Sequence, residues 1–467
     1  MAEAGTAAPA ARRHGVNIFA EHKPMWQLLL AFLVPLMLSN VLQSLSQTMA
    51  SIWIGRLIST DALAAVSAVF PVVFFLFSFL IGISSGGTIL IGQAFGAGDH
   101  HRVKRIAGTV IGAGLYVGIL VAIVGSVFSP AMLAALATPA NIIGQADAYA
   151  KVVFWTMPVI FLSLVYTSAL RGTGDSTTPF WVLLVASIVA IGLTPIFILG
   201  PFGLPKLGVV SAAVAGGIGN VVALGFIVVY LHRRHHLLRF DREMLADLLV
   251  DWKILWSVVR IGVPAGLQFV MMSLAEIAVI SFVNRFGSAA TAAYGAVNQV
   301  VNYVAFPAMT IGISASIFGA QCIGARREDK LGSVIRSAVA LNYAMGALSI
   351  VLCYAFAWNI LGWFIVDEQT LRIAHELLAI TLWSYAIFGN TAVLSGIMRG
   401  SGDVVWPTAI WIISIWGIEV PAAYLLMHRF GLDGVWMGYP IAFLGGLLLQ
   451  FCYYEFFWKK KTHERLV

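Results

Sequence analysis

The sequence predicts an all-α, polytopic membrane protein in which 12 transmembrane helices form two parallel six-helix repeats around a central cavity. Two observations lead to this prediction. The first is composition: 60% of the 467 residues are hydrophobic and only 10% are charged, whereas a soluble domain carries about 25% charged residues. The second is a duplicated pentapeptide, Arg-Gly-x-Gly-Asp, which occurs at 171–175 and again, 228 residues later, at 399–403.

Twelve apolar segments are long enough to cross a bilayer as helices, since one span needs about 20 residues. They are too long and too numerous for the strands of a barrel, and they lack an alternation of period two. Several exceed the length of one span, which favours tilted helices or helices that extend past the bilayer. The predicted segments are 26–54, 62–95, 104–136, 145–170, 178–200, 208–231, 255–285, 290–323, 333–364, 373–398, 405–427 and 434–458.

The same offset of 228 residues relates other positions, which indicates that the two halves are copies of one unit. Gln93 and Gly96 correspond to Gln321 and Gly324, for example. Six helices return the chain to the side where it began, so the repeat is parallel. We expect a disordered cytoplasmic tail at 1–24, an N-lobe at 25–231, a cytoplasmic linker at 232–254, a C-lobe at 255–458 and a basic cytoplasmic tail at 459–467.

The basic residues predict the orientation of the chain. Of the 28 lysines and arginines, 22 fall on the side that holds both termini, and positive loops stay in the cytoplasm. We therefore expect both termini to be cytoplasmic, in a multi-pass plasma membrane protein of the bacterial inner membrane. The net charge of +7 then reflects topology and contact with anionic lipid, and requires no nucleic-acid partner.

Two further features exclude other kinds of protein. The N-terminal stretch is polar and alanine-rich without an apolar core, which argues against a signal peptide. Cys322, Cys353 and Cys452 each stand alone inside an apolar segment, so we expect neither a disulfide framework nor a metal site.

Two acidic residues lie deep inside apolar segments: Glu276 in the seventh and Glu419 in the eleventh. A charge at the bilayer centre costs at least about 2.5–3.5 kcal/mol, so such residues are candidates for function. The corresponding first-half positions are Thr48 and Ile191. The second half alone therefore carries the candidate residues for ion or substrate coupling.

Each acid has an alternative interpretation. Glu276 can hold Na⁺, a proton or an organic cation, or it can be a protonated group that hydrogen-bonds a neighbouring helix. Glu419 stands near Trp411, Trp416 and Tyr424. These rings can attract a lipophilic cation, or they can face lipid at the interface.

Other polar side chains in the apolar segments predict the lining of a cavity, because no water inside lipid satisfies them. The alternative is hydrogen bonding between helices. The first segment carries a polar stripe at helical spacing, and the seventh, eighth and tenth segments add further positions. The candidate cavity-lining residues are Asn40, Gln43, Gln47, Gln268, Asn298, Gln299, Asn302, Tyr385 and Asn390.

The two Arg-Gly-x-Gly-Asp elements fall at the predicted cytoplasmic ends of segments 4 and 10. Their glycines can end a helix, Arg171 and Arg399 can extend towards the membrane surface, and Asp175 and Asp403 can cap the next helix. A phosphate cradle is the alternative. Because the chain has no Gly-x4-Gly-Lys-Ser/Thr element, we expect turn motifs rather than an ATP site.

Several motifs in order resemble the multidrug and toxic compound extrusion (MATE) transporters of the MOP superfamily. They are Asn-Val-Leu-Gln-Ser-Leu at 40–45, Ile-Trp-Ile-Gly-Arg at 52–56, Gly-Gln-Ala-Phe-Gly-Ala-Gly at 92–98 with its partner at 319–325, and the doubled Arg-Gly-x-Gly-Asp. The resemblance covers nearly all of 26–458. It implies a secondary antiporter that expels cationic, lipophilic drugs or metabolites in exchange for Na⁺ or H⁺.

The chain departs from the family pattern in the first half. Many members carry an aspartate in segment 1, where this chain has Ala50, and another in segment 5, where it has Thr194. The family's second-half cation site includes a glutamate in segment 7, which Glu276 resembles. The residues and the resemblance thus both assign ion coupling to the second half.

We therefore expect an antiporter that works by alternating access as a monomer, with a small organic cation and membrane lipids as partners. It is not expected to be an enzyme or to need a cofactor beyond the coupling ion, H⁺ or Na⁺. The alternative on the same fold is a flippase for a lipid-linked or anionic metabolite. An intramembrane enzyme would need clustered acids or a nucleophile–base pair, and a receptor or scaffold would leave Glu276 unexplained.

Overall fold

A computed structural model describes residues 16, 18, 19, 23–136, 138–203, 205–363, 365 and 367–466. Within them, 12 helical spans are long and apolar enough to cross a membrane, which confirms the predicted number. Most of the tail predicted at 1–24 lies outside the described residues. The α-helices are α1 (Met25–Leu57), α2 (Thr60–Gly96), α3 (His100–Ala135), α4 (Ile143–Gly172), α5 (Thr177–Leu199), α6 (Ser211–Arg233), α7 (Arg242–Ala246), α8 (Trp252–Val283), α9 (Ser288–Gly324), α10 (Leu331–Ala355), α11 (Ala357–Gly362), α12 (Glu368–Thr381), α13 (Tyr385–Gly400), α14 (Val405–Ile412), α15 (Val420–Phe430) and α16 (Leu432–Phe456).

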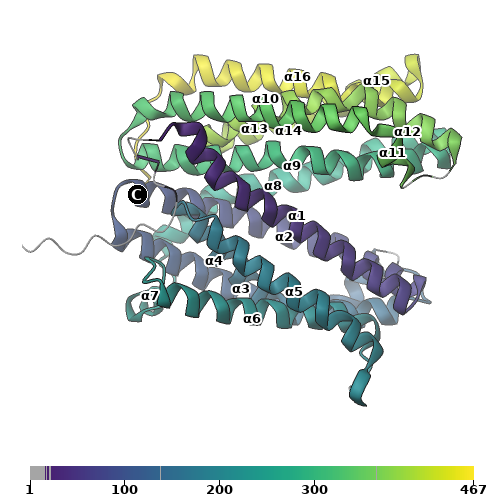
Figure 1. Cartoon of the computed structure of the whole chain (residues 1–467), viewed down its shortest axis with the longest axis horizontal. Coiled ribbons are helices and arrows are strands. Elements are labelled where there is room, and N and C mark those ends of the chain that lie inside the picture. The colour runs from purple at the N-terminus through teal and green to yellow at the C-terminus, as the bar shows by residue number, and fades with distance from the viewer. Residues whose placement is uncertain are drawn as a thin grey trace, which may run out of the picture. The chain divides into compact units, whose positions relative to one another are not determined.

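The helices group into two compact units. The first unit contains 38–77 and 98–258, and the second contains 22–37, 78–97 and 259–467. Helices α1 and α2 therefore contribute a segment to each unit. In the first unit, α3 packs along α4 and α5 along α6 (Figure 1).

Glycines allow the helices of the first unit to pack closely. A Cβ on Gly118 of α3 would lie 2.6 Å from the Cα of Pro158 on α4, and a Cβ on Gly219 of α6 would lie 2.6 Å from the Ala186 carbonyl oxygen on α5. Small residues at helix contacts let backbones approach closely, which is how membrane helices gain van der Waals contact.

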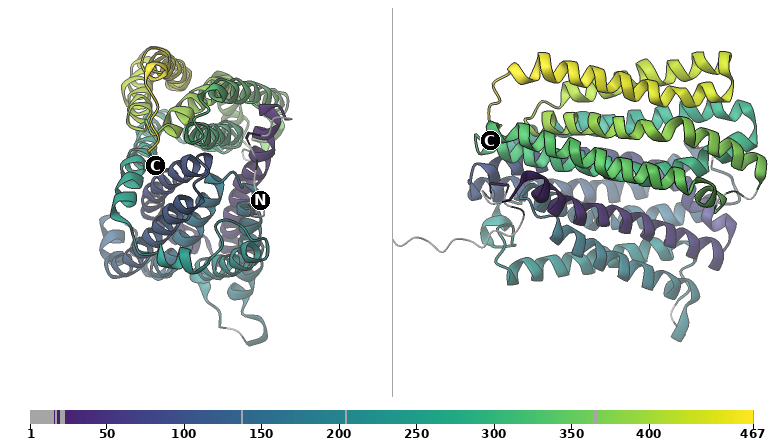
Figure 2. Two further views of the ribbon diagram at one scale, coloured as in Figure 1. Left: turned by 90° about the vertical axis from the view of Figure 1, so that its left-hand side faces the viewer. Right: turned by 45° about the horizontal axis from the view of Figure 1, so that its top comes forward.

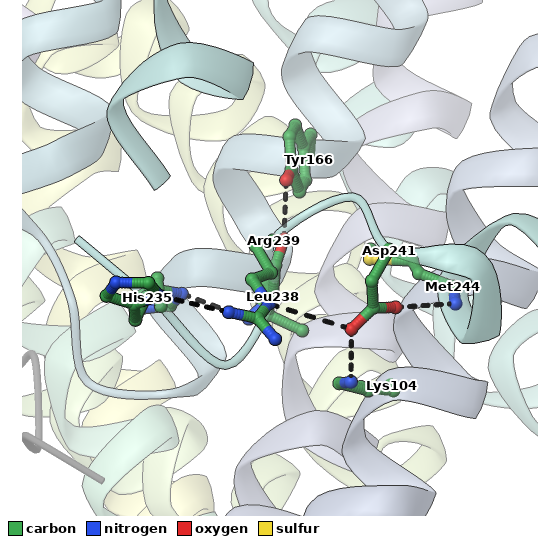
Figure 3. Close-up of polar contacts among 8 residues, drawn as sticks. Lys104, Tyr166, His235, Leu238, Arg239, Asp241 and Met244 are labelled. Atoms are coloured by element: carbon green, nitrogen blue, oxygen red, sulfur yellow. Dashed lines mark hydrogen bonds and ion pairs between the residues drawn. The ribbon is translucent and has the colours of Figure 1, made fainter. Parts of the chain in front are cut away.

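The segment predicted as a basic linker folds against the helices before it (Figure 3). The Tyr166 hydroxyl on α4 donates to the Leu238 carbonyl at 2.5 Å, and Lys104 on α3 pairs with Asp241 at 2.6 Å. The Met244 amide donates to the other Asp241 oxygen at 3.0 Å. These contacts fix the segment to the ends of α3 and α4.

In the second unit, α9 packs along α13, and α16 packs along α13 and α15. Figure 2 shows the long green-to-yellow helices of this unit running alongside one another. A large apolar core fills the space between α9, α12 and α16, and Trp436 is fully buried in it. The ring of Trp436 stacks on Tyr294 with centroids 5.8 Å apart.

Three spans of the second half are irregular where the sequence predicted continuous segments. Within the segment predicted at 333–364, α10 ends at Ala355 and a separate helix, α11, begins at Ala357. The tenth span has a 3₁₀ turn at Leu382–Ser384 between α12 and α13, and the eleventh has a π-helical segment at Ile413–Glu419 between α14 and α15. The corresponding helices of the first half, α4 and α5, are continuous.

Local chemistry explains the interruptions of the tenth and eleventh spans. The hydroxyls of Thr381 and Ser384 donate to the carbonyls of Leu377 and Thr381 at 2.8 and 2.5 Å, and such back-bonding bends helices. Pro421 follows the π-helical segment at the start of α15. Proline has no amide hydrogen to continue the helical ladder, so the bonds before it rearrange.

Candidate functional site

Glu276 lies on α8 with an exposed side chain. The side-chain amide of Asn298 on α9 donates to its Oε1 at 3.1 Å. The structure therefore brings together two residues that the sequence predicted as part of the site. A carboxylate held by one amide keeps its other oxygen free to accept a cation.

Glu419 ends the π-helical segment and is only 7% exposed. It interacts electrostatically with Glu276. A second link joins their helices: the indole Nε1 of Trp416 in the π-helical segment donates to the Met271 carbonyl on α8 at 3.1 Å.

The Glu419 side chain lines a hollow of about 10 Å³ whose wall is mostly apolar. The rings of Phe388, Trp411 and Phe443 line it together with Glu419. Phe388 contacts Trp411 and Phe443 with ring centroids 5.3 and 5.2 Å apart, and Tyr385 contacts Phe443 at 5.2 Å. We call these four aromatic residues the aromatic cage.

Two tyrosines that the sequence did not mark as candidates lie near these residues. The hydroxyls of Tyr294 on α9 and Tyr439 on α16 are 3.0 Å apart, and Asn298, on the same helix as Tyr294, donates to Glu276. Tyr294 lies one helical turn before Asn298, and this spacing was the available signal in the sequence.

The other predicted second-half residues lie in different surroundings. Gln268 is buried and accepts a hydrogen bond from Arg399. Asn390 is buried and bonds Asn342 at 3.0 Å and Tyr343 at 2.7 Å, both on α10. These contacts match the alternative of hydrogen bonding between helices. Gln299 and Asn302 are exposed, and Gln299 lines a separate hollow of about 450 Å³ with Asp367 and Thr370.

Asn40, Gln43 and Gln47 fall in the part of α1 that belongs to the first unit. Gln43 and Gln47 are exposed and Asn40 is half-buried. Their role as cavity-lining residues stays a prediction.

The two Arg-Gly-x-Gly-Asp loops differ in detail. Asp175 caps α5 as predicted, since it accepts from the amides of Thr177 and Thr178 at 3.0 and 2.9 Å. Asp403 does not cap a helix; it accepts instead from the Tyr453 hydroxyl at 2.7 Å and from Lys461 at 2.9 Å. The expected cap is wrong for Asp403, because its carboxylate is occupied by the side chains of Tyr453 on α16 and Lys461 beyond it.

The expected outward extension is also wrong for Arg399. The Nε atoms of Arg171 and Arg399 are both buried and have no hydrogen-bond partner among the described residues. Arg399 reaches inward to Gln268 on α8.

The helical spans and the acid-bearing second half define a multi-pass membrane transporter. The chain belongs to the MatE family, whose model matches residues 35–196 and again residues 264–425. The double match confirms the predicted internal repeat and the family that the motifs resemble. Proteins of this family are transporters and not enzymes.

The relatives agree with this assignment. The chain is 49% identical to the probable multidrug resistance protein YoeA of Bacillus subtilis, over 95% of this chain and 96% of that protein. Among solved structures, it matches the bent form of the Vibrio cholerae MATE transporter VcmN with a TM-score of 0.84 and 20% identity, over 92% and 96% of the two chains. The chain also matches a MOP superfamily transporter from Pyrococcus furiosus with a TM-score of 0.85 and 22% identity, over 94% of this chain and 98% of that chain. That structure is reported with a binding pocket of reverse polarity that suggests a different function.

Proposed function

We propose that this chain is a secondary active antiporter that exports cationic, lipophilic drugs or metabolites in exchange for H⁺ or Na⁺ by alternating access. The observation that supports this most directly is the pair of interacting carboxyl groups, Glu276 and Glu419, in the second half only. An organic cation needs negative charge in its site, and the exposed carboxylate of Glu276 offers it. The name of the Bacillus relative, a probable multidrug resistance protein, agrees with this class of substrate.

The proposed protein acts as a monomer in the bacterial plasma membrane with both termini in the cytoplasm. The Arg-Gly-x-Gly-Asp loops then lie at the cytoplasmic ends of α4 and α13. Its cargo is a small organic cation, and it needs no cofactor besides the coupling ion.

A flippase for a lipid-linked or anionic metabolite is the alternative on this fold. Such cargo calls for basic side chains, because phosphate and carboxylate groups are recognised by arginine and lysine. The described side chains that line the hollow beside Glu419 include a carboxyl and no lysine or arginine. The cationic cargo is therefore favoured.

The drug resistance of a host that lacks its own efflux pumps tests the proposed export of organic cations. Cells that express the wild type should tolerate ethidium or a similar lipophilic cation, and Glu276→Gln should abolish this resistance while the protein still inserts. Glu368→Gln is the matched control, because Glu368 is exposed and pairs only with the neighbouring Arg372 at 2.6 Å. Unchanged resistance in Glu276→Gln would contradict the role of this carboxylate in transport.

Transport in proteoliposomes tests the coupling separately. A pH gradient and a Na⁺ gradient are imposed in separate experiments, and uptake of the same cation is followed by fluorescence. Antiport predicts uptake with at least one of the two gradients. If neither gradient moves the cation and an anionic lipid headgroup binds instead, the flippase is the better assignment.

A further inference from the structure

The Glu419 carboxyl is nine-tenths buried and lacks a conventional partner. It accepts no hydrogen bond from any residue that the structure describes, although it lines a hollow. Of the hydroxyls that share this wall, Thr391 and Ser414 donate to carbonyls of their own helices, Ile387 at 3.4 Å and Ile410 at 2.7 Å. An ionised carboxylate without donors in apolar surroundings is strongly disfavoured.

The hollow is also a poor site for a metal cation. Hard cations are held by a shell of several oxygen ligands, but most of this wall is carbon from Phe388, Trp411, Ile415 and Phe443. Its volume of about 10 Å³ is close to the space that one water molecule needs. A proton on the carboxyl removes the charge and requires neither donors nor a ligand shell.

Glu276 has the opposite surroundings. Its side chain is exposed, and it accepts a hydrogen bond from Asn298 at 3.1 Å. This side chain is therefore more accessible to a ligand than the buried Glu419 carboxyl. The two acids of this site therefore suit two different tasks.

We propose that the coupling ion is a proton carried by the carboxyl group of Glu419, while the carboxylate of Glu276 binds the organic cation. This inference rests on the antiport function proposed above and assigns its coupling ion.

Electrostatics supplies the exchange. The carboxylates of Glu276 and Glu419 repel each other when both are ionised, so one charge favours a proton on the other. A cation bound at Glu276 cancels that repulsion, and Glu419 then releases its proton. One positive charge binds and one leaves, so the charge of the site is conserved. Coupling is reciprocal, so protonation of Glu419 weakens binding of the cation at Glu276.

The remaining titratable groups near Glu419 are phenols. Those that interact with it electrostatically are Tyr294, Tyr385 and Tyr439. Free phenols titrate at about pH 10, so these groups stay neutral in the range where a carboxyl exchanges a proton. They are not alternative carriers of the proton.

One side-chain hydrogen bond links the helices that carry the two acids. Glu419 ends the π-helical segment, and Trp416 of the same segment holds the Met271 carbonyl on the helix of Glu276. Segments of this kind occur often at functional sites, because their hydrogen bonds can shift by one residue. A change in the charge of Glu419 therefore acts on a part of the helix that is bonded directly to α8.

Proton release on ligand binding tests the proposal. The purified full-length chain in detergent and weak buffer is titrated with tetraphenylphosphonium, and a pH indicator and equilibrium dialysis report protons released and cation bound. The wild type should release about one proton for each bound cation. Glu419→Gln should bind the cation and release none, whereas Glu419→Asp, which keeps the carboxyl, should retain release. Glu276→Gln should weaken binding by about tenfold or more.

The possible outcomes separate this inference from the proposed function. Proton release that is unchanged in Glu419→Gln overturns the role of Glu419. Binding without proton release in the wild type, with Na⁺ competing for the cation, overturns the proton as coupling ion but leaves antiport intact. Absence of tetraphenylphosphonium binding to a folded wild type contradicts the cationic substrate and, with it, both proposals.

Discussion

The side-chain amide of Gln93 on α2 donates to the main-chain carbonyl of Gly400 at 3.0 Å, although the two residues are 307 positions apart. The carbonyl oxygen of the same side chain accepts from the Leu466 amide at 2.9 Å. Gln93 is fully buried. One glutamine thus joins the end of α2 to the second Arg-Gly-x-Gly-Asp loop and to the segment that follows α16.

Replacing this glutamine should destabilise the second unit. In Gln93→Leu, the Gly400 carbonyl and the Leu466 amide lose their partner, which costs about 1–3 kcal/mol for a buried group. We expect a lower midpoint in thermal unfolding of the purified protein. Gln299→Leu is the control, because Gln299 is exposed and should leave the midpoint unchanged. An equal midpoint for Gln93→Leu and the wild type would contradict the role of this bond.

Two corresponding glycines make a reciprocal contact beside Gln93. A Cβ on Gly96 would collide with the main-chain carbonyl of Gln321, and a Cβ on Gly324 would collide with that of Gln93. Gly324→Ala should therefore cost about 1–3 kcal/mol through overpacking. Gly332→Ala in α10 meets nothing within 4 Å and should instead stabilise by about 0.5–1 kcal/mol, because alanine suits a helix better. Thermal unfolding of both variants measures the difference, and the same sign for both would refute this packing.

How much the sequence foretold depends on the kind of interaction. The spans and the repeat follow from apolar length and from a fixed offset, so both were predictable. The sequence placed both acids, Glu276 and Glu419, in the second half, but it did not indicate that they interact. The aromatic cage could not be derived, because Phe388, Trp411 and Phe443 come from three spans and nothing local marks them as neighbours.

Other features depend on contacts that spacing alone does not specify. Asp175 and Asp403 occupy equivalent positions in identical motifs, yet only Asp175 caps a helix. The difference arises from Tyr453 and Lys461, which reach Asp403 from a segment more than 40 residues away. The π-helical segment is similar: Pro421 was visible in the sequence, but the direction in which the helix would rearrange was not.

The segment after each half's last helix contacts that half's Arg-Gly-x-Gly-Asp loop. His236 approaches Asp175 at 3.8 Å, and Lys461 pairs with Asp403 at 2.9 Å. In the second half, Trp458 is 3% exposed and its Nε1 donates to the Ser401 hydroxyl at 2.9 Å. The repeat therefore continues beyond the membrane spans.

Trp458→Ala should release this second contact. Loss of a buried tryptophan costs about 3–5 kcal/mol when the site cannot collapse. We expect faster trypsin cleavage after Lys459 to Lys461, detected by mass spectrometry of the intact protein. Trp363→Ala removes an exposed tryptophan elsewhere and serves as the control. Equal cleavage rates in the two variants would argue against the docked segment.

The Lys104–Asp241 pair predicts a stability that depends on pH. Burial opposes ionisation of Asp241, but hydrogen bonds from Lys104 and the Met244 amide outweigh it and hold the pKa of this carboxyl below its usual range. A lowered pKa in the folded state stabilises above the unfolded value of about 3.9 and loses its effect as pH falls through the folded value.

Asp241→Asn should therefore destabilise by about 1 kcal/mol at pH 7, and this difference should shrink as the pH falls below about 4. Thermal unfolding of both proteins over a pH series provides the measurement. Glu368→Gln breaks an exposed pair with Arg372 and should show almost no difference at any pH. A difference for Asp241→Asn that stays constant down to about pH 3 would exclude titration of this carboxyl as its source.

Asn390 and Glu276 should separate stability from transport. Asn390 is buried and bonds Asn342 and Tyr343 on α10, so Asn390→Ala leaves buried polar groups unpaired at a cost of about 1–3 kcal/mol. Because these contacts join α10 to α13, we expect Asn390 to serve packing, and resistance per molecule of inserted protein should be retained. Glu276→Gln should show the reverse, with near wild-type thermal stability and no resistance. Thermal unfolding and drug tolerance are measured on the same two variants. A loss of transport in an Asn390→Ala protein that remains stable would assign Asn390 to the cavity, as its position in the sequence first suggested.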